Sequence, residues 1–126
     1  MDKACICRIR DIYKAIARFE SEVEKTFSLN INELTLLCIL AEKQCLSSGE
    51  LTRELSLSAS NTSKVIGALE AKGHVKRRLS KEDKRSMLFT LTPKGTAILS
   101  DVCCHRLQIP PEIAPLLDPV EGSRAE

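Results

Sequence analysis

At 126 residues, with 43% hydrophobic and 29% charged residues, the chain has the size and composition of one soluble globular domain. Its net charge of +2 is unevenly distributed, because residues 53–94 carry ten Lys and Arg against four Asp and Glu. This local balance of +6 favours a nucleic-acid partner, and a solvated charged surface is the alternative. The apolar runs are too short to span a bilayer and the first residues lack a secretory signal, which predicts a cytoplasmic protein with no membrane partner.

Two amphipathic helices are predicted in the first third of the chain. Apolar residues recur every three or four positions in residues 5–27, which indicates one long helix with Tyr13, Phe19 and Phe27 in its core stripe. Asn30 or Asn32 is suited to cap a second helix. The buried stripe expected for this second helix consists of Leu34, Leu37, Cys38 and Ala41.

Two short helices with a tight break between them are predicted next. Ser47 precedes Glu50 by three residues, which is the spacing of a capping box and indicates a short helix that ends near residues 56–57. Ser58 begins the second helix of the pair, and Gly73 is its expected stop. Val65, Ile66 and Leu69 form its apolar face. Such a pair is typical of a helix-turn-helix.

The rest of the chain predicts a hairpin, a helix and a tail. Residues 75–79 and 87–91 are the expected strands, joined by the polar stretch 80–86. Thr92 caps a further helix with Pro93 in its first position, and this helix reaches about residue 109. Prolines confine residues 110–126 to a partly ordered tail with a turn or two of helix around residues 112–117. The prediction is one domain over residues 1–109, mainly α with a small β-hairpin, that is, a winged helix-turn-helix.

The second helix of the pair carries polar side chains in its first two turns, opposite its apolar face. Asn can bond adenine with both amide atoms, Ser and Thr can bond bases or phosphates, and Lys prefers guanine or phosphate. The alternative is that these residues merely cap the helix. The candidate DNA-binding residues of this helix are Ser58, Ser60, Asn61, Thr62, Ser63 and Lys64.

The hairpin adds cations beside that helix, which favours DNA contact over a merely solubilising hairpin. Asp83 lies among these cations and is expected to pair with an arginine such as Arg77 or Arg85 and so hold the wing in shape. The candidate DNA-binding residues of the wing are Arg77, Arg78, Lys81, Asp83, Lys84 and Arg85.

The sequence resembles the multiple antibiotic resistance regulator (MarR) family between about residues 29 and 100. The most specific stretch is residues 69–77, Leu-Glu-Ala-Lys-Gly-His-Val-Lys-Arg, followed by Asp83-Lys84-Arg85 and by residues 91–95, Leu-Thr-Pro-Lys-Gly. Lys84 stands where the family's wing motif has its middle Arg, which keeps the charge but loses the planar fork.

The resemblance implies a homodimer joined through residues 5–27 and 93–109, with a DNA-binding core at about residues 31–92. It implies a pseudo-palindromic double-stranded operator, and a repressor released by a small-molecule inducer or by thiol oxidation. The proline-rich tail departs from the family, which ends in a long sixth helix.

Six cysteines are present and free thiols are expected, because long helical periodicities need no disulfides. Three roles stay open for them, namely packing, redox sensing and metal sensing. Residues two apart on a helix point about 200° away from each other, so Cys5 and Cys7 cannot face one partner together. The candidate redox residues are Cys5, Cys7, Cys103 and Cys104.

No catalytic or cofactor-binding motif is present in the sequence, so we predict no enzymatic activity, no cofactor and no metal. The alternative function is a winged-helix module that docks on another protein, but aromatic anchors for such a surface are few. If the DNA assignment holds, Arg85→Ala weakens binding to all sequences and Asn61→Ala mainly erodes discrimination.

Overall fold

The computed structural model describes residues 1–83, 86–104 and 109–117. Its elements follow in the order α1 (Lys3–Phe27), α2 (Ile31–Lys43), β1 (Cys45–Ser47), α3 (Ser48–Leu55), α4 (Ala59–Ala71), β2 (Val75–Leu79), β3 (Met87–Leu91), α5 (Pro93–Cys104) and α6 (Ala114–Leu117). They form two compact units, one of Met1–Ser28 with Leu107–Glu126 and one of Leu29–Arg106. The single domain expected over residues 1–109 stays a prediction.

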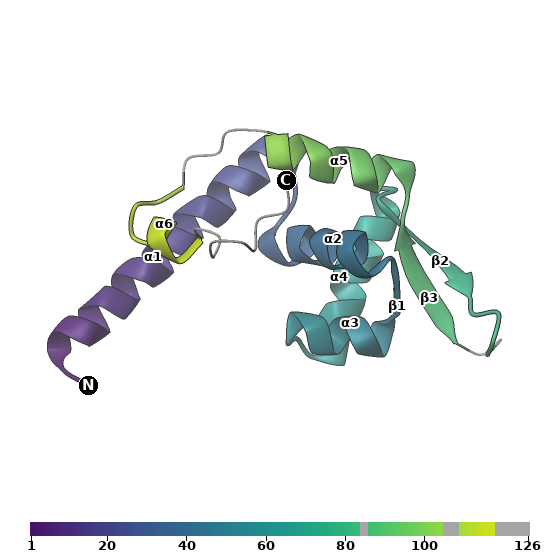
Figure 1. Ribbon diagram of the computed structural model, residues 1–126, viewed down its shortest axis with the longest axis horizontal. Helices are drawn as coiled ribbons and strands as arrows, with labels where there is room; N and C mark the ends of the chain where they lie inside the picture. The colour runs from purple at the N-terminus through teal and green to yellow at the C-terminus, as the bar shows by residue number, and fades with distance from the viewer. Residues whose placement is uncertain (84–85, 105–108, 118–126) are drawn as a thin grey trace, which may run out of the picture. The chain divides into compact units, whose positions relative to one another are not determined.

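The unit Leu29–Arg106 is a winged helix (Figure 1). Helices α2, α3 and α4 pack on one another, and β3 packs against α2. The sheet is antiparallel with the order β1-β3-β2, and Phe89 in its central strand lies opposite both Leu46 and Arg77. The β2–β3 hairpin extends beyond the helices as the wing (Figure 1). The predicted fold class of a winged helix-turn-helix is confirmed.

Local sequence signals account for the helix ends in this unit. Asn30 caps α2 and Ser47 caps α3, each in a reciprocal capping box with the glutamate three residues on. Ser58 caps α4. The Thr92 hydroxyl accepts the Gly95 N–H at 3.0 Å at the start of α5. These predicted caps are confirmed, as are both predicted strands of the wing.

The structure of this unit differs from the expected one in the buried face of α2 and in an additional strand. Leu34 and Leu37 of α2 are buried, but Cys38 and Ala41 are exposed, because the helix buries a different arc. β1 was not predicted, since three residues carry no periodicity and the strand forms only by pairing with β3. The completely buried large side chains of this unit include Leu36, Leu37, Leu40, Leu51 and Leu69.

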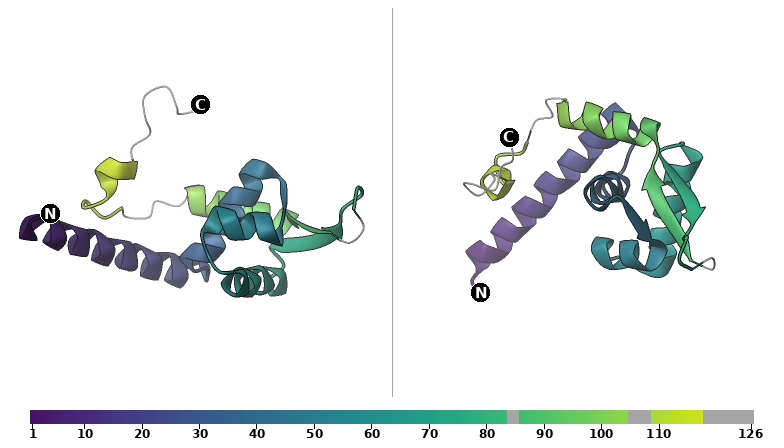
Figure 2. Two further views of the ribbon diagram at one scale, coloured as in Figure 1. Left: turned by 90° about the horizontal axis from the view of Figure 1, so that it is seen from below. Right: turned by 45° about the vertical axis from the view of Figure 1, so that its right-hand side comes forward.

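In the unit of α1 and residues 109–117, two exposed side chains make a two-point contact. The Arg18 guanidinium donates to both carboxylate oxygens of Glu112, at 3.1 and 3.2 Å. Helix α1 runs without a break in both views of Figure 2. Tyr13, expected in a core stripe, is 73% exposed, so this placement was wrong, because the apolar stripe is wider than the surface the chain itself covers.

The other end of the chain agrees with the proline pattern. Helix α5 is described from Pro93 to Cys104 and Ile109 is not helical, while the predicted end of this helix lies outside the described residues. Helix α6 provides the single helical turn expected near residues 112–117. Within residues 1–83, 86–104 and 109–117, no helix has the length and apolar character needed to cross a membrane.

Candidate nucleic-acid interface

The first two turns of α4 present a polar, cationic surface. Ser58 accepts the Asn61 N–H on its hydroxyl at 3.0 Å, and the first turn contains no acidic residue. Opposite this surface, Val65, Ile66 and Leu69 are buried, as predicted. The unpaired N–H groups and the dipole of a helix N-terminus favour an anion such as phosphate. The exposed candidate residues are Ser58, Ser60, Asn61, Ser63 and Lys64.

Thr62 does not share this surface. Its side chain is 1% exposed, and its hydroxyl donates to the Ser58 carbonyl oxygen at 2.9 Å. This position is on the inner side of α4, and its hydroxyl satisfies a backbone carbonyl. Thr62 therefore lies outside the exposed polar surface of α4, and its hydroxyl stabilises the first turn of the helix.

A tight turn sets α4 against α3. Helix α3 ends at Leu55, and Ser56 follows in the left-handed region with φ 56°. The Ser56 N–H donates to the Arg53 carbonyl at 3.3 Å, and the Leu57 N–H donates to the Thr52 carbonyl at 3.3 Å. Since Ser58 already caps α4, only three residues separate the helices, which fixes the direction in which α4 presents its first turns.

The wing places further cations in solvent. Arg78 and Lys81 are exposed, and Arg78 donates to the Cys45 Sγ at 3.8 Å. Asp83 accepts the Ser86 hydroxyl on its carboxylate at 3.0 Å, and the Ser86 N–H donates to the Asp83 carbonyl at 2.9 Å. Asp83 thus stabilises the turn of the wing. Lys84 and Arg85 lie outside the described residues, so the proposed pairing of Asp83 with Arg85 stays a prediction.

Arg77, one of the two arginines expected to pair with Asp83, pairs with Glu70. The Arg77 Nε and Nη2 donate to the two Glu70 carboxylate oxygens at 2.7 and 2.6 Å. These hydrogen bonds lower the pKa of Glu70 and raise that of Arg77. The guanidinium also lies 5.5 Å from the centre of the Phe89 ring. Glu70 was not predicted as a site residue, although its place seven residues before Arg77, across the Gly73 turn, is the signal that could have revealed it.

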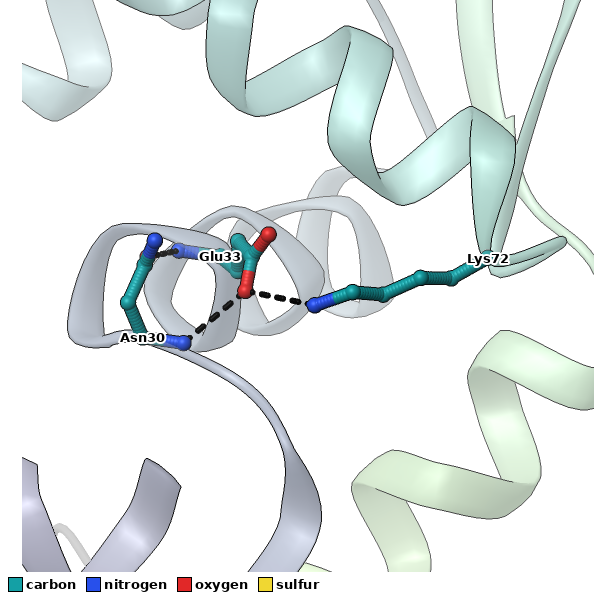
Figure 3. Close-up of polar contacts among 3 residues, drawn as sticks. All are labelled: Asn30, Glu33 and Lys72. Atoms are coloured by element: carbon teal, nitrogen blue, oxygen red, sulfur yellow. Dashed lines mark hydrogen bonds and ion pairs between the residues drawn. The ribbon is translucent and has the colours of Figure 1, made fainter. Parts of the chain in front are cut away.

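A second ion pair ties the far end of α4 to α2 (Figure 3). The Glu33 side chain is 5% exposed and accepts the Lys72 ammonium at 3.0 Å on Oε1. The same oxygen accepts the Asn30 N–H at 2.8 Å, and the Asn30 side chain accepts the Glu33 N–H at 2.8 Å. One carboxylate therefore caps α2 and anchors the last residues of α4.

All six cysteines are free thiols, and Cys5, Cys7, Cys103 and Cys104 are exposed. Cys5 and Cys7 belong to the α1 unit, and Cys103 and Cys104 belong to the winged unit. Cys38 lies at the surface, but the atoms that cover part of it raise the pKa of its thiol, and the charge of the Cys103 thiol raises that pKa further. Across the described parts of the chain, no three His, Cys, Asp or Glu side chains gather as a metal ion would require.

The winged helix-turn-helix, with an exposed polar helix and a cationic wing, places the unit in a class of folds that many nucleic-acid-binding proteins use. Residues 29–87 match the model of the MarR family. The winged unit is therefore a MarR-family domain, and the resemblance seen in the sequence is confirmed.

Curated relatives agree with this family. The HTH-type transcriptional regulator PapX of Escherichia coli is 31% identical over 86 residues, which are 67% of this chain and 52% of PapX. The multiple antibiotic resistance protein MarR of Salmonella typhimurium is 30% identical over 78 residues, which are 62% of this chain and 53% of that protein. The chain spans about half the length of the curated relatives it matches.

Solved structures share the fold. The transcriptional regulator BldR of Sulfolobus solfataricus has a TM-score of 0.69 at 26% identity, over 80% of this chain and 76% of BldR. A mutant of Escherichia coli MarR, solved in complex with operator DNA, has a TM-score of 0.66 at 24% identity, over 80% of this chain and 76% of that one.

Proposed function

We propose that the chain is a transcriptional regulator that binds double-stranded DNA in a sequence-specific manner. The observation that carries this proposal is the exposed start of α4, with Asn61 and Lys64, in one unit with a wing that exposes Arg78 and Lys81. An α-helix fits the major groove, where Asn61 would bond adenine and Lys64 would bond guanine or phosphate. The wing cations would bind phosphates or enter the minor groove. Relatives named as transcriptional regulators support the proposal.

We also propose a homodimer on a pseudo-palindromic operator, because two copies related by a two-fold axis would match two half-sites. Helix α1 supports this arrangement with apolar side chains that the chain leaves uncovered. Ile6, Ile9 and Tyr13 are 56%, 55% and 73% exposed, respectively. A second copy would remove this surface from water. A repressor role, and release by a small-molecule inducer, remain further parts of the proposal.

A salt titration of DNA binding tests the function. For the unmodified protein and a short duplex of random sequence, fluorescence anisotropy should show affinity that falls steeply with salt, because phosphate contacts release counterions. Lys81→Ala should weaken binding to every duplex and reduce the slope of log affinity against log salt by about 1. Asn61→Ala should reduce the preference for an operator by about 1–3 kcal/mol with the slope unchanged.

The matched control is Lys14→Ala, which removes an exposed cation from α1 and leaves the winged unit intact. Affinity and slope should then stay at their unmodified values. Loss of binding in Lys14→Ala equal to that in Lys81→Ala would contradict the wing assignment. A folded protein that fails to bind DNA at low salt would favour the alternative, a winged-helix module that docks on another protein.

We propose thiol oxidation as one route of release, supported by the packing of α5, which carries Cys103, against α2, which carries Cys38. Hydrogen peroxide would oxidise one thiol to a sulfenic acid with loss of water, and the second thiol would displace a second water to form a disulfide. This bond between α2 and α5 should lower operator affinity roughly tenfold or more, and a dithiol reductant should restore it. Cys103→Ser should abolish the effect.

The control for this prediction is Cys45→Ser, which removes the half-buried thiol of β1 and should leave the peroxide response unchanged. Mass spectrometry of the non-reduced protein shows whether the disulfide has formed. A disulfide between Cys38 and Cys103 with no change in operator affinity would rule out this route of release.

A further inference from the structure

The path of the chain from α4 into the wing is short and well defined. Helix α4 ends at Ala71, and β2 begins at Val75. Gly73 between them has φ 82°, a left-handed conformation that favours glycine. The His74 N–H donates to the Leu69 carbonyl at 2.9 Å, and the Gly73 N–H donates to the Glu70 carbonyl at 3.0 Å. This is a Schellman cap, which leaves three residues to join the proposed recognition helix to the wing.

The joint between α4 and β2, residues 72–74, is stabilised by side chains as well as by these backbone hydrogen bonds. Glu70 lies in the last turn of α4 and Arg77 lies in the middle of β2, and they meet in a two-point ion pair across the cap. The planar guanidinium forms both hydrogen bonds with one carboxylate, which fixes its orientation as well as its distance. Phe89, opposite Arg77 in the sheet, supports the guanidinium from β3. The joint therefore connects α4 to both strands of the wing.

We propose that the Glu70–Arg77 pair fixes the direction of the wing relative to α4, so that Arg77 acts as a positioning residue for DNA binding. This inference rests on the proposed function, because the two elements would contact the same duplex. Arg77 has its Nε and one terminal nitrogen bonded to a carboxylate that cancels its charge. A phosphate that approached Arg77 would also meet the negative charge of Glu70.

Arg78, the next residue of β2, has different surroundings from Arg77. Arg78 points to the opposite face of β2, because side chains alternate along a strand, and its described hydrogen bond is the long contact with the Cys45 Sγ. Its charge is not cancelled by that thiol. Of these two adjacent arginines, Arg78 fits a phosphate contact and Arg77 fits a structural pair within the domain.

A charge swap separates the two roles of Arg77. Glu70→Gln and Arg77→Glu should each weaken operator binding roughly tenfold. The double variant with Glu70→Arg and Arg77→Glu keeps the net charge and the ion pair, and should bind within about threefold of the unmodified protein. The slope of affinity against salt should be the same for the double variant and the unmodified protein.

A direct contact between Arg77 and a DNA phosphate would give a different result. If Arg77 bound a phosphate, the double variant would stay as weak as Arg77→Glu and its slope would fall by about 1. That result would overturn the proposal. The matched control is Arg78→Glu, a reversal at the next residue, which should weaken binding and reduce the slope whichever residue stands at position 70.

Residual dipolar couplings test the orientation without DNA. The amide couplings of α4 and of the β2–β3 strands should fit one alignment tensor in the unmodified protein. They should need two in Glu70→Gln, and one again in the swapped double variant. One tensor in Glu70→Gln would overturn the proposal even if DNA binding were reduced. If the unmodified protein did not bind DNA at all, the proposed function would fail, while these couplings would still show whether the pair orients the wing.

Discussion

Gly95→Ala is expected to destabilise the winged unit by about 3 kcal/mol, at the upper end of the cost of overpacking. A Cβ atom at Gly95 would overlap the carbonyl oxygen of His74 and lie 3.0 Å from its carbonyl carbon. These are backbone atoms, so no side-chain rotation relieves the overlap. The same His74 carbonyl accepts the Thr92 N–H at 3.0 Å, so moving it apart also breaks the start of α5. Urea unfolding followed by circular dichroism measures the change.

Gly67→Ala is the matched control for this prediction. Gly67 lies in the middle of α4, and apart from its chain neighbours and the backbone of that helix nothing lies within 4 Å of an added Cβ. Alanine there should stabilise the protein by about 0.5–1 kcal/mol, because glycine is the weaker helix former. The two glycine variants should therefore move the unfolding midpoint in opposite directions. A Gly95→Ala protein as stable as the unmodified one would contradict the close contact between α5 and His74.

Glu33→Ala is expected to destabilise the protein by about 2–3 kcal/mol. Removing one partner of a buried ion pair costs roughly 3–5 kcal/mol, and this value is reduced here because the Lys72 side chain is 36% exposed and can turn to water. The variant also leaves the Asn30 N–H without its carboxylate acceptor. Both the start of α2 and the end of α4 lose a contact. Urea unfolding measures the total loss in the free energy of unfolding.

Glu50→Ala isolates the capping part of this effect. Glu50 holds the same third position of a capping box, in α3, where its carboxylate accepts the Ser47 N–H at 2.9 Å. Loss of this cap alone should cost about 1 kcal/mol. The difference in the free energy of unfolding between the two variants measures the contribution of the Glu33–Lys72 ion pair, which connects α2 to the end of α4. Equal losses in Glu33→Ala and Glu50→Ala would show that the Lys72 contact adds no stability.

Signals that lie close together in the sequence predicted much of the fold. Ser47 and Ser58 were recognised as caps because the residues that complete a cap stand within four positions. The wing strands were bounded correctly because turn residues flank short runs of β-formers. The helix of the proposed DNA surface was also placed correctly, with its polar residues mostly in solvent.

Contacts between distant residues could not be found in this way. The pairing of β1 with β3 joins Leu46 to Phe89, and no periodicity in either segment specifies it. Glu33 meets Lys72 across 39 positions of sequence. The burial of Thr62 was missed for another reason, because its hydrogen-bond partner, Ser58, is only four residues away. Its polarity suggested exposure, whereas a hydroxyl can be buried when it donates to a nearby backbone carbonyl.

Ser47 belongs to two elements at once. It is the last residue of β1, opposite Leu88, and its hydroxyl accepts the Glu50 N–H at the start of α3. No linker residue separates the strand from the helix, so an insertion or deletion at this joint would shift both the sheet register and the cap. Changes of chain length in the wing turn between β2 and β3 would leave both the β1–β3 register and this cap in place. Length variation that this fold tolerates during evolution should therefore concentrate in the wing turn and spare the joint between β1 and α3.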